Sequence, residues 1–112
     1  MNSLSILITN KLLVGTSGTE WYVRDVCLEL LRQGHRPMVY APVLGELARE
    51  LLAATVPVVD DLACITVEPD VIHGHHSLET LAALSHWADT PALFVCHDWS
   101  AWHDRQIGRA HV

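Results

Sequence analysis

Histidine is concentrated in one short stretch of this chain, the segment DVIHGHHSLET from Asp70 to Thr80. His73, His75 and His76 fall within four positions there. A further imidazole, that of His97, ends the apolar run PALFVC. An imidazole can act as a general acid or base near neutral pH, and its neutral form can bind a metal ion. The spacing therefore raises two hypotheses, a metal site and a strand end that faces a bound ligand.

The metal hypothesis is the weaker of the two. His73 and His75 are two apart on an expected strand and can share one face, but His76 is adjacent to His75 and must point elsewhere. A structural zinc ion needs four convergent ligands, and a catalytic one usually needs three. The nearest carboxylates, Asp70 and Asp98, have no recognisable ligand spacing. We therefore expect no bound metal.

A second candidate for chemistry is the segment GTSG, which consists of Gly15, Thr16, Ser17 and Gly18. Ser17 and Glu20 have the spacing of a capping box, so a helix should begin near Gly18. Glycine allows close approach to the backbone, and a helix N-terminus offers free N–H groups to a phosphate. The segment is neither GxGxxG nor a Walker loop. A phosphate-binding loop and a capped strand-to-helix turn both remain open.

The elements that must position these residues alternate between apolar runs and amphipathic helices. Apolar runs near residues 4, 38, 57, 71 and 92 predict strands, and helical spacing predicts helices over 18–33, over 44–55 and after Ser77. Right-handed crossovers then give an α/β fold. We expect a Rossmann-like parallel sheet of about five strands, in the order 3-2-1-4-5, with helices on both faces.

Two helices have a clear apolar face. In the first, this face is formed by Val23, Val26, Cys27, Leu30 and Leu31. In the second, we expect it to be formed by Leu44, Leu47, Ala48, Leu51 and Leu52.

The predicted strand order brings the candidate residues together. Ligands of such sheets bind at the carboxyl ends of the strands, where the strand order reverses. That point lies between the first and fourth strands, which are followed by the GTSG segment and by the sequence GHHS. The fifth strand is followed by His97 and Asp98. The imidazoles are therefore expected where a ligand would lie.

Composition limits the class of protein. The chain has 112 residues, 50% of them hydrophobic, which suits one folded domain. Its formal net charge of -6 argues against nucleic acid as a partner. No apolar run reaches the roughly 18 residues of a transmembrane segment, and the N-terminus lacks the basic start of a signal peptide. Cys27, Cys64 and Cys96 form no CxxC pair; we expect reduced core thiols in a cytoplasmic protein, either free or peripheral at the inner membrane face.

Three segments taken together resemble a known family of enzymes. They are GTSGTEWYVRDVCLELLRQGHRPMVYAP, PDVIHGHHSLET and PALFVCHDWSAWHD. In this order they resemble the N-terminal domain of family 4 glycosyltransferases of the GT-B fold, and the resemblance covers about residues 4 to 104. Members of that family transfer a sugar from a nucleotide-sugar donor to a sugar or glycan acceptor, with retention at the anomeric carbon.

The resemblance implies two Rossmann-like domains across a cleft, the N-terminal one holding mainly the acceptor. It implies that backbone amides of residues 15–18 approach the donor phosphate. The family usually has two glycines where this chain has Ser17 and Gly18. It also implies that His97 lines the reaction centre as the catalytic histidine. No cofactor and no protein-bound metal are implied. The other residues that would line the cleft are His73, His75, His76 and Asp98.

The resemblance also implies a C-terminal domain, which binds most of the nucleotide sugar and is missing from this chain. The last six residues, IGRAHV, are similar to a translated sequencing-library adapter. We therefore expect an incomplete N-terminal domain over 1–105, a non-native tail over 106–112, and no activity of the chain alone. Two alternatives are a stand-alone Rossmann-like ligand-binding module and a metal-dependent hydrolase that uses the histidine-rich edge.

Overall fold

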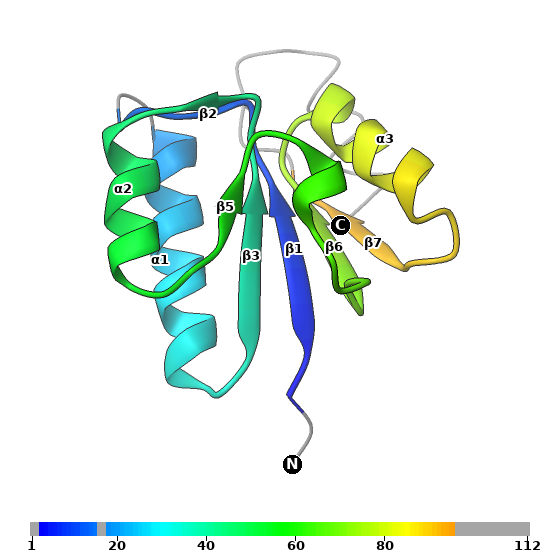
Figure 1. Ribbon diagram of the computed structural model, residues 1–112, viewed down its shortest axis with the longest axis horizontal. Helices are drawn as coiled ribbons and strands as arrows, with labels where there is room; N and C mark the ends of the chain where they lie inside the picture. The colour runs from blue at the N-terminus through cyan, green and yellow to red at the C-terminus, as the bar shows by residue number, and fades with distance from the viewer. Residues whose placement is uncertain (1–2, 16–17, 96–112) are drawn as a thin grey trace.

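The computed structural model describes residues 3–15 and 18–95, which form an α/β fold around a parallel sheet (Figure 1). The strands are β1 (Ser5–Thr9), β2 (Leu12–Leu13), β3 (Arg36–Tyr40), β4 (Val43–Leu44), β5 (Val58–Val59), β6 (Val71–Gly74) and β7 (Ala92–Phe94). The helices are α1 (Gly18–Arg32), α2 (Glu46–Ala53), the short 3-10 helix η1 (Leu62–Cys64) and α3 (Ser77–His86).

The main sheet confirms the predicted topology. Its five strands lie in the order β5-β3-β1-β6-β7, and every neighbouring pair is parallel. Ranked along the chain, this is the expected 3-2-1-4-5. Thr9 at the end of β1 lies opposite Tyr40 on one side and Gly74 on the other. The strand order therefore reverses between β1 and β6.

Two apolar clusters cover the two faces of the sheet, which explains the continuous apolar run of β1. Ile6 and Ile8 belong to one cluster and Leu7 to the other, because successive side chains of a strand point to opposite faces. The first cluster includes residues of α1 and α2, which lie next to each other and away from α3 in Figure 1. The second includes residues of η1 and α3.

The apolar face predicted for α1 is confirmed, but the one predicted for α2 is only partly right. Leu47, Ala48 and Leu51 are buried. Leu44 precedes the helix in β4 and Leu52 lies on its outer side, so both are exposed.

Within the described part of the chain, no helix has the length and hydropathy that crossing a membrane requires.

A second, smaller sheet was missed by the sequence reasoning. β2 and β4 form a parallel pair, with Leu12 opposite Val43 and Leu13 opposite Leu44. The N–H of Gly45 then donates to the carbonyl of Leu13 at 3.1 Å. This pair joins the connections that follow β1 and β3, and it fixes the path of the chain into α1.

The expectation of core cysteines is right for Cys27 and wrong for Cys64. Cys27 is fully buried in α1. Cys64 is exposed because η1 turns only Leu62 into the core, while Asp61 accepts the Ala63 N–H at 3.0 Å and holds the rest of the turn outside. Cys96 lies outside the described residues.

We expect an alkylating reagent to modify Cys64 of the folded protein much faster than Cys27. Burial raises the pKa of the Cys27 thiol to about 12, and the thiolate is the reactive form, so Cys27 is both shielded and protonated at neutral pH. Iodoacetamide labelling followed by peptide mass spectrometry measures both rates. The difference should vanish in urea; equal rates in the native protein would contradict the buried position of Cys27.

Candidate functional site at the carboxyl edge of the sheet

The edge where the strand order reverses contains buried polar side chains. Asn10 follows β1 and His75 follows β6, and they are only 1% and 2% exposed. Thr9 and Thr80 are buried beside them. Buried polar groups at this edge of a parallel sheet lie where ligands of such folds bind. The candidate site is therefore built around the carboxyl ends of β1 and β6.

The two threonines tie α3 to this edge. The hydroxyls of Thr9 and Thr80 lie 3.1 Å apart, and the backbone N–H of His75 donates to the Thr9 hydroxyl at 3.3 Å. Gly74 makes this close approach possible, because a Cβ atom there would lie 2.3 Å from Oγ1 of Thr80. The start of α3 is therefore held against the central strand.

Asn10 was not singled out from the sequence. Its Nδ2 donates to the carbonyl of Leu12 at 2.8 Å, and its backbone N–H donates to Tyr40 at 3.0 Å. Its Oδ1 is buried and has no hydrogen-bond partner among the described residues. Such an acceptor can take a hydrogen bond from a bound molecule. The feature of the sequence that could have identified Asn10 is its position, an amide side chain directly after a continuous apolar run.

The carboxylate of Glu20 organises the loop between β2 and α1. Glu20 is fully buried in the first turn of α1, and its Oε1 accepts the backbone N–H groups of Val14 at 2.6 Å and Gly15 at 2.9 Å. The capping-box spacing correctly predicted the start of α1 at Gly18. It did not predict that Glu20 would bind the loop upstream of the cap.

The two glycines of the GTSG segment have different roles. Gly15 has a φ of +96°, which favours glycine, and its N–H is already bonded to Glu20. Gly18 is exposed at the start of α1, and a Cβ atom there would meet nothing within 4 Å. A phosphate would therefore find its open backbone approach at Gly18 rather than at Gly15.

The histidines at the end of β6 pack against α1. The rings of His73 and His75 are stacked with centroids 4.7 Å apart. Tyr22 of α1 meets them edge-on, at 6.5 Å from His73 and 5.4 Å from His75. His76 is the cap residue before α3, so the helix begins at Ser77 and not after it as predicted. The imidazoles of His73 and His75 thus support the helix that begins at the GTSG segment.

The described residues offer no metal cluster. No group of three or more histidine, cysteine, aspartate or glutamate side chains in this part of the chain is arranged to hold a metal ion. His73 and His75 supply at most two ligands from β6, and a structural site needs four.

We predict that the protein purified without a histidine tag carries no stoichiometric zinc. Metal analysis of the purified chain measures the content. One tightly held zinc ion per chain, lost in His73→Ala or His75→Ala, would contradict this prediction. His86→Ala is a suitable control, because His86 is exposed at the far end of α3.

Four predicted site residues, Thr16, Ser17, His97 and Asp98, lie outside the described residues. Of the others, Gly15 and Gly18 flank the start of α1, while His73, His75 and His76 lie at the end of β6.

Comparisons with protein-family models, curated proteins and solved structures found no match to this chain.

Proposed function

We propose that this chain is the acceptor-side domain of a retaining glycosyltransferase that uses a nucleotide-sugar donor. The observation that carries the proposal is the contact between two segments where the strand order reverses. One segment is the start of α1 from Gly18, whose Tyr22 lies edge-on to His75, and the other leads from β6 through His75 into α3. Both belong to the segments that resemble family 4 glycosyltransferases.

In this proposal, the donor diphosphate lies at the N-terminus of α1. The N–H groups of a helix N-terminus and the positive end of the helix dipole favour an anion there. Glu20 occupies the amides of Val14 and Gly15 and adds negative charge on that side, which directs the phosphate toward Gly18. Glu20 is thus a positioning residue, and Gly18 marks the point of contact.

The chemical step itself involves the donor sugar and its diphosphate leaving group. Retaining transfer passes through an oxocarbenium-like centre while the diphosphate departs, and positioned dipoles stabilise both charges. His97 would shape the sugar site, and a second, C-terminal domain would supply most of the nucleotide contacts. The acceptor hydroxyl would approach from the sheet edge near Asn10, whose buried Oδ1 can accept a hydrogen bond.

We expect two substitutions to separate these roles in the enzyme completed by its C-terminal domain. His97→Ala should lower kcat by about 10- to 1,000-fold, as expected for one positioned active-site group. Gly18→Val should raise KM for the nucleotide sugar, because the added side chain blocks backbone approach. The assay is transfer from a panel of nucleotide sugars.

Gly18→Ala is the control for folding, because the site has room for a Cβ atom. Its melting temperature should match or exceed that of the parent. If the His97→Ala enzyme were fully active, His97 would not belong to the active site. If Gly18→Val left the KM for the nucleotide sugar unchanged, the start of α1 would not belong to the donor site.

A further inference from the structure

The outer side of α3 is an exposed apolar surface that the proposed function does not use. The helix has the sequence SLETLAALSH, in which Glu79 is the only acidic residue and no lysine or arginine occurs. Leu78 and Leu81 are three residues apart and are therefore neighbours on the helix surface. Their side chains are 77% and 59% exposed. A helix that is apolar on all sides is usually covered on all sides, so another segment should lie on these two leucines.

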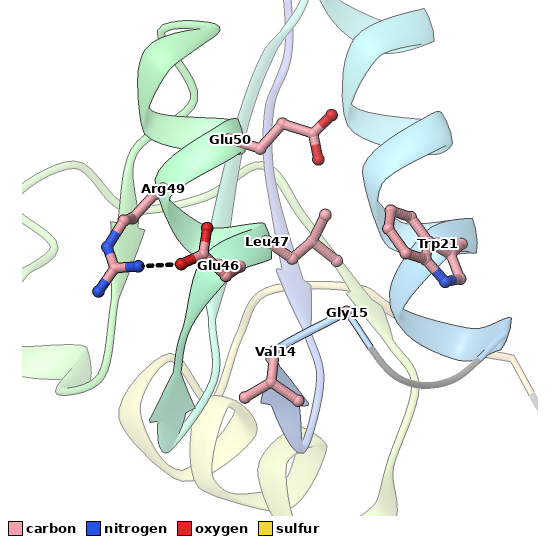
Figure 2. A pocket seen from close by; sticks show the side chains of 7 residues that line it. All are labelled: Val14, Gly15, Trp21, Glu46, Leu47, Arg49 and Glu50. Carbon is pink, nitrogen blue, oxygen red and sulfur yellow. Dashed lines mark hydrogen bonds and ion pairs between the residues drawn. The ribbon is translucent and has the colours of Figure 1, made fainter.

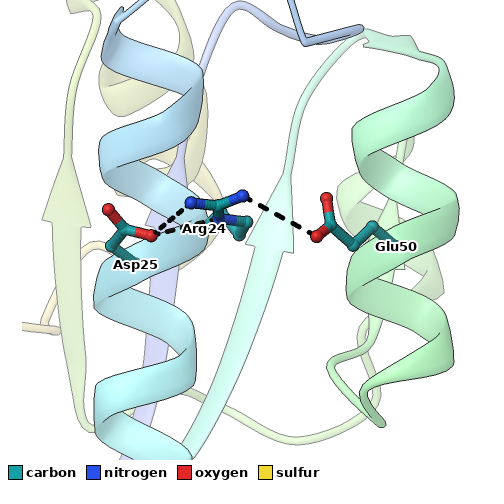
Figure 3. Close-up of polar contacts among 3 residues, drawn as sticks. All are labelled: Arg24, Asp25 and Glu50. Carbon is teal, nitrogen blue, oxygen red and sulfur yellow. Dashed lines mark hydrogen bonds and ion pairs between the residues drawn. The ribbon is translucent and has the colours of Figure 1, made fainter.

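The outer sides of α1 and α2 differ from that of α3, because they carry paired charges. Arg24 of α1 forms ion pairs with Asp25 at 2.9 Å and with Glu50 of α2 at 3.7 Å (Figure 3). Arg49 of α2 pairs with Glu46 (Figure 2). Charged side chains of this kind are mostly found in contact with water. The outer side of α3 is therefore the one least suited to remain exposed.

The topology of the sheet directs the chain after β7 to the same face as α3. β7 is the edge strand, and Val95 is the last described residue. The chain still follows β6 there, since the N–H of Val95 donates to the carbonyl of Gly74 at 2.8 Å. Crossovers between parallel strands are right-handed, and α3 makes the crossover from β6 outward to β7. A segment that continues outward from β7 with the same hand lies on the α3 face.

The sequence after Val95 contains two side chains that suit this surface. Trp99 and Trp102 are three residues apart and are the only large apolar residues between positions 96 and 106. In a helical turn, two residues with this spacing lie on the same side. Burial of an indole removes about 150–250 Å² of surface from water. Two such rings can therefore cover two exposed leucines.

We propose that Trp99 and Trp102 pack on Leu78 and Leu81, so that residues 97–106 cover the outer side of α3. Asp104 falls on the opposite side of such a helical turn and stays in water. The proposal goes beyond the proposed function and does not depend on it, because it involves neither a donor nor an acceptor. A second copy of the chain is the other possible occupant of this surface, and the test distinguishes the two.

The direct test is NMR spectroscopy of the full 112-residue chain, combined with sedimentation equilibrium. We expect a monomer in which ring protons of Trp99 or Trp102 give nuclear Overhauser contacts to methyl groups of Leu78 or Leu81. The absence of every such contact in the assigned spectra would overturn the proposal. A dimer whose intermolecular contacts involve these two leucines would also overturn it, because a second copy would then cover α3.

Proteolysis by chymotrypsin, which cleaves after tryptophan, provides a second measurement. A docked segment must leave α3 before it can be cleaved. Cleavage after Trp99 and Trp102 should be at least about tenfold slower than in a synthetic peptide of residues 94–108. The double variant Leu78→Ser/Leu81→Ser should be cleaved at close to the rate of the peptide. Mass spectrometry of the products identifies the cleaved bonds.

Leu52→Ser is the matched control, since Leu52 is 52% exposed on α2, which lies away from α3 in Figure 1. This variant should be protected as the parent is. All three substitutions replace exposed side chains, and circular dichroism verifies that each variant is folded. The proposal is overturned if the parent is cleaved as fast as the peptide, or if the double variant is protected as the parent is. Equal loss of protection in Leu52→Ser would overturn it as well.

Discussion

Replacing Glu20 with alanine is expected to lower the free energy of unfolding by about 2–4 kcal/mol. The substitution leaves the N–H groups of Val14 and Gly15 without their buried acceptor. An unsatisfied buried group costs about 1–3 kcal/mol, and these two N–H groups are partly buried, so the lower part of that range applies to each. Urea denaturation followed by circular dichroism measures the change. Glu20→Gln should lose less, because its amide oxygen can still accept both hydrogen bonds.

Glu29→Ala is the matched control on the same helix. Glu29 is exposed, and hydrogen bonds from Arg32 and Gln33 lower the pKa of its carboxyl to about 2. Solvent screens such surface pairs, so the substitution should change stability very little. If Glu20→Ala were as stable as Glu29→Ala, the carboxylate of Glu20 would not be holding the loop.

Gly74→Ala is expected to lower the free energy of unfolding by about 1–3 kcal/mol, the usual range for an overpacked core. The new methyl group would lie 2.3 Å from Oγ1 and 2.6 Å from Cγ2 of Thr80, so α3 or the Thr80 side chain must move. Movement of Thr80 also breaks its contact with the Thr9 hydroxyl. Urea denaturation of the purified variant measures the loss.

A double-mutant cycle with Thr80→Ala identifies the cause of this loss. Removing Oγ1 and Cγ2 relieves the collision, so Gly74→Ala should cost less in the Thr80→Ala background by about 1 kcal/mol. Gly18→Ala is the control, since a Cβ atom at that glycine meets nothing within 4 Å. Strict additivity of the two changes would show that Thr80 does not determine the cost at Gly74.

The order of the main sheet could be predicted because its signals are local and continuous. The run in β1 is apolar at every position from Leu4 to Ile8 except Ser5, which indicates a strand covered on both faces. Gly34 follows α1 and has a φ of +89°, so the helix ends where the sequence indicates. Alternation of strands and helices then leaves few topologies.

The parts that were missed depend on contacts between distant residues. β2 and β4 have two residues each, too few to show a periodicity. Their pairing sets the path of the chain before α1, and so decides which amides Glu20 can reach. His75 contacts the ring of Tyr22, which belongs to another element. Composition and spacing contain neither fact.

Sugar transfer tests most directly the proposal that this chain is one half of a glycosyltransferase. The measurement compares the 112-residue chain with a continued protein, in which this chain is joined to a matching glycosyltransferase C-terminal domain, using one panel of nucleotide sugars and acceptors. Catalysis requires both reactants to be held in register, which half a cleft cannot do. We expect that only the continued protein transfers sugar, and that NMR of the product shows a retained anomeric configuration. Robust turnover by the 112-residue chain alone, or a continued protein that transfers no sugar from any donor, would contradict it.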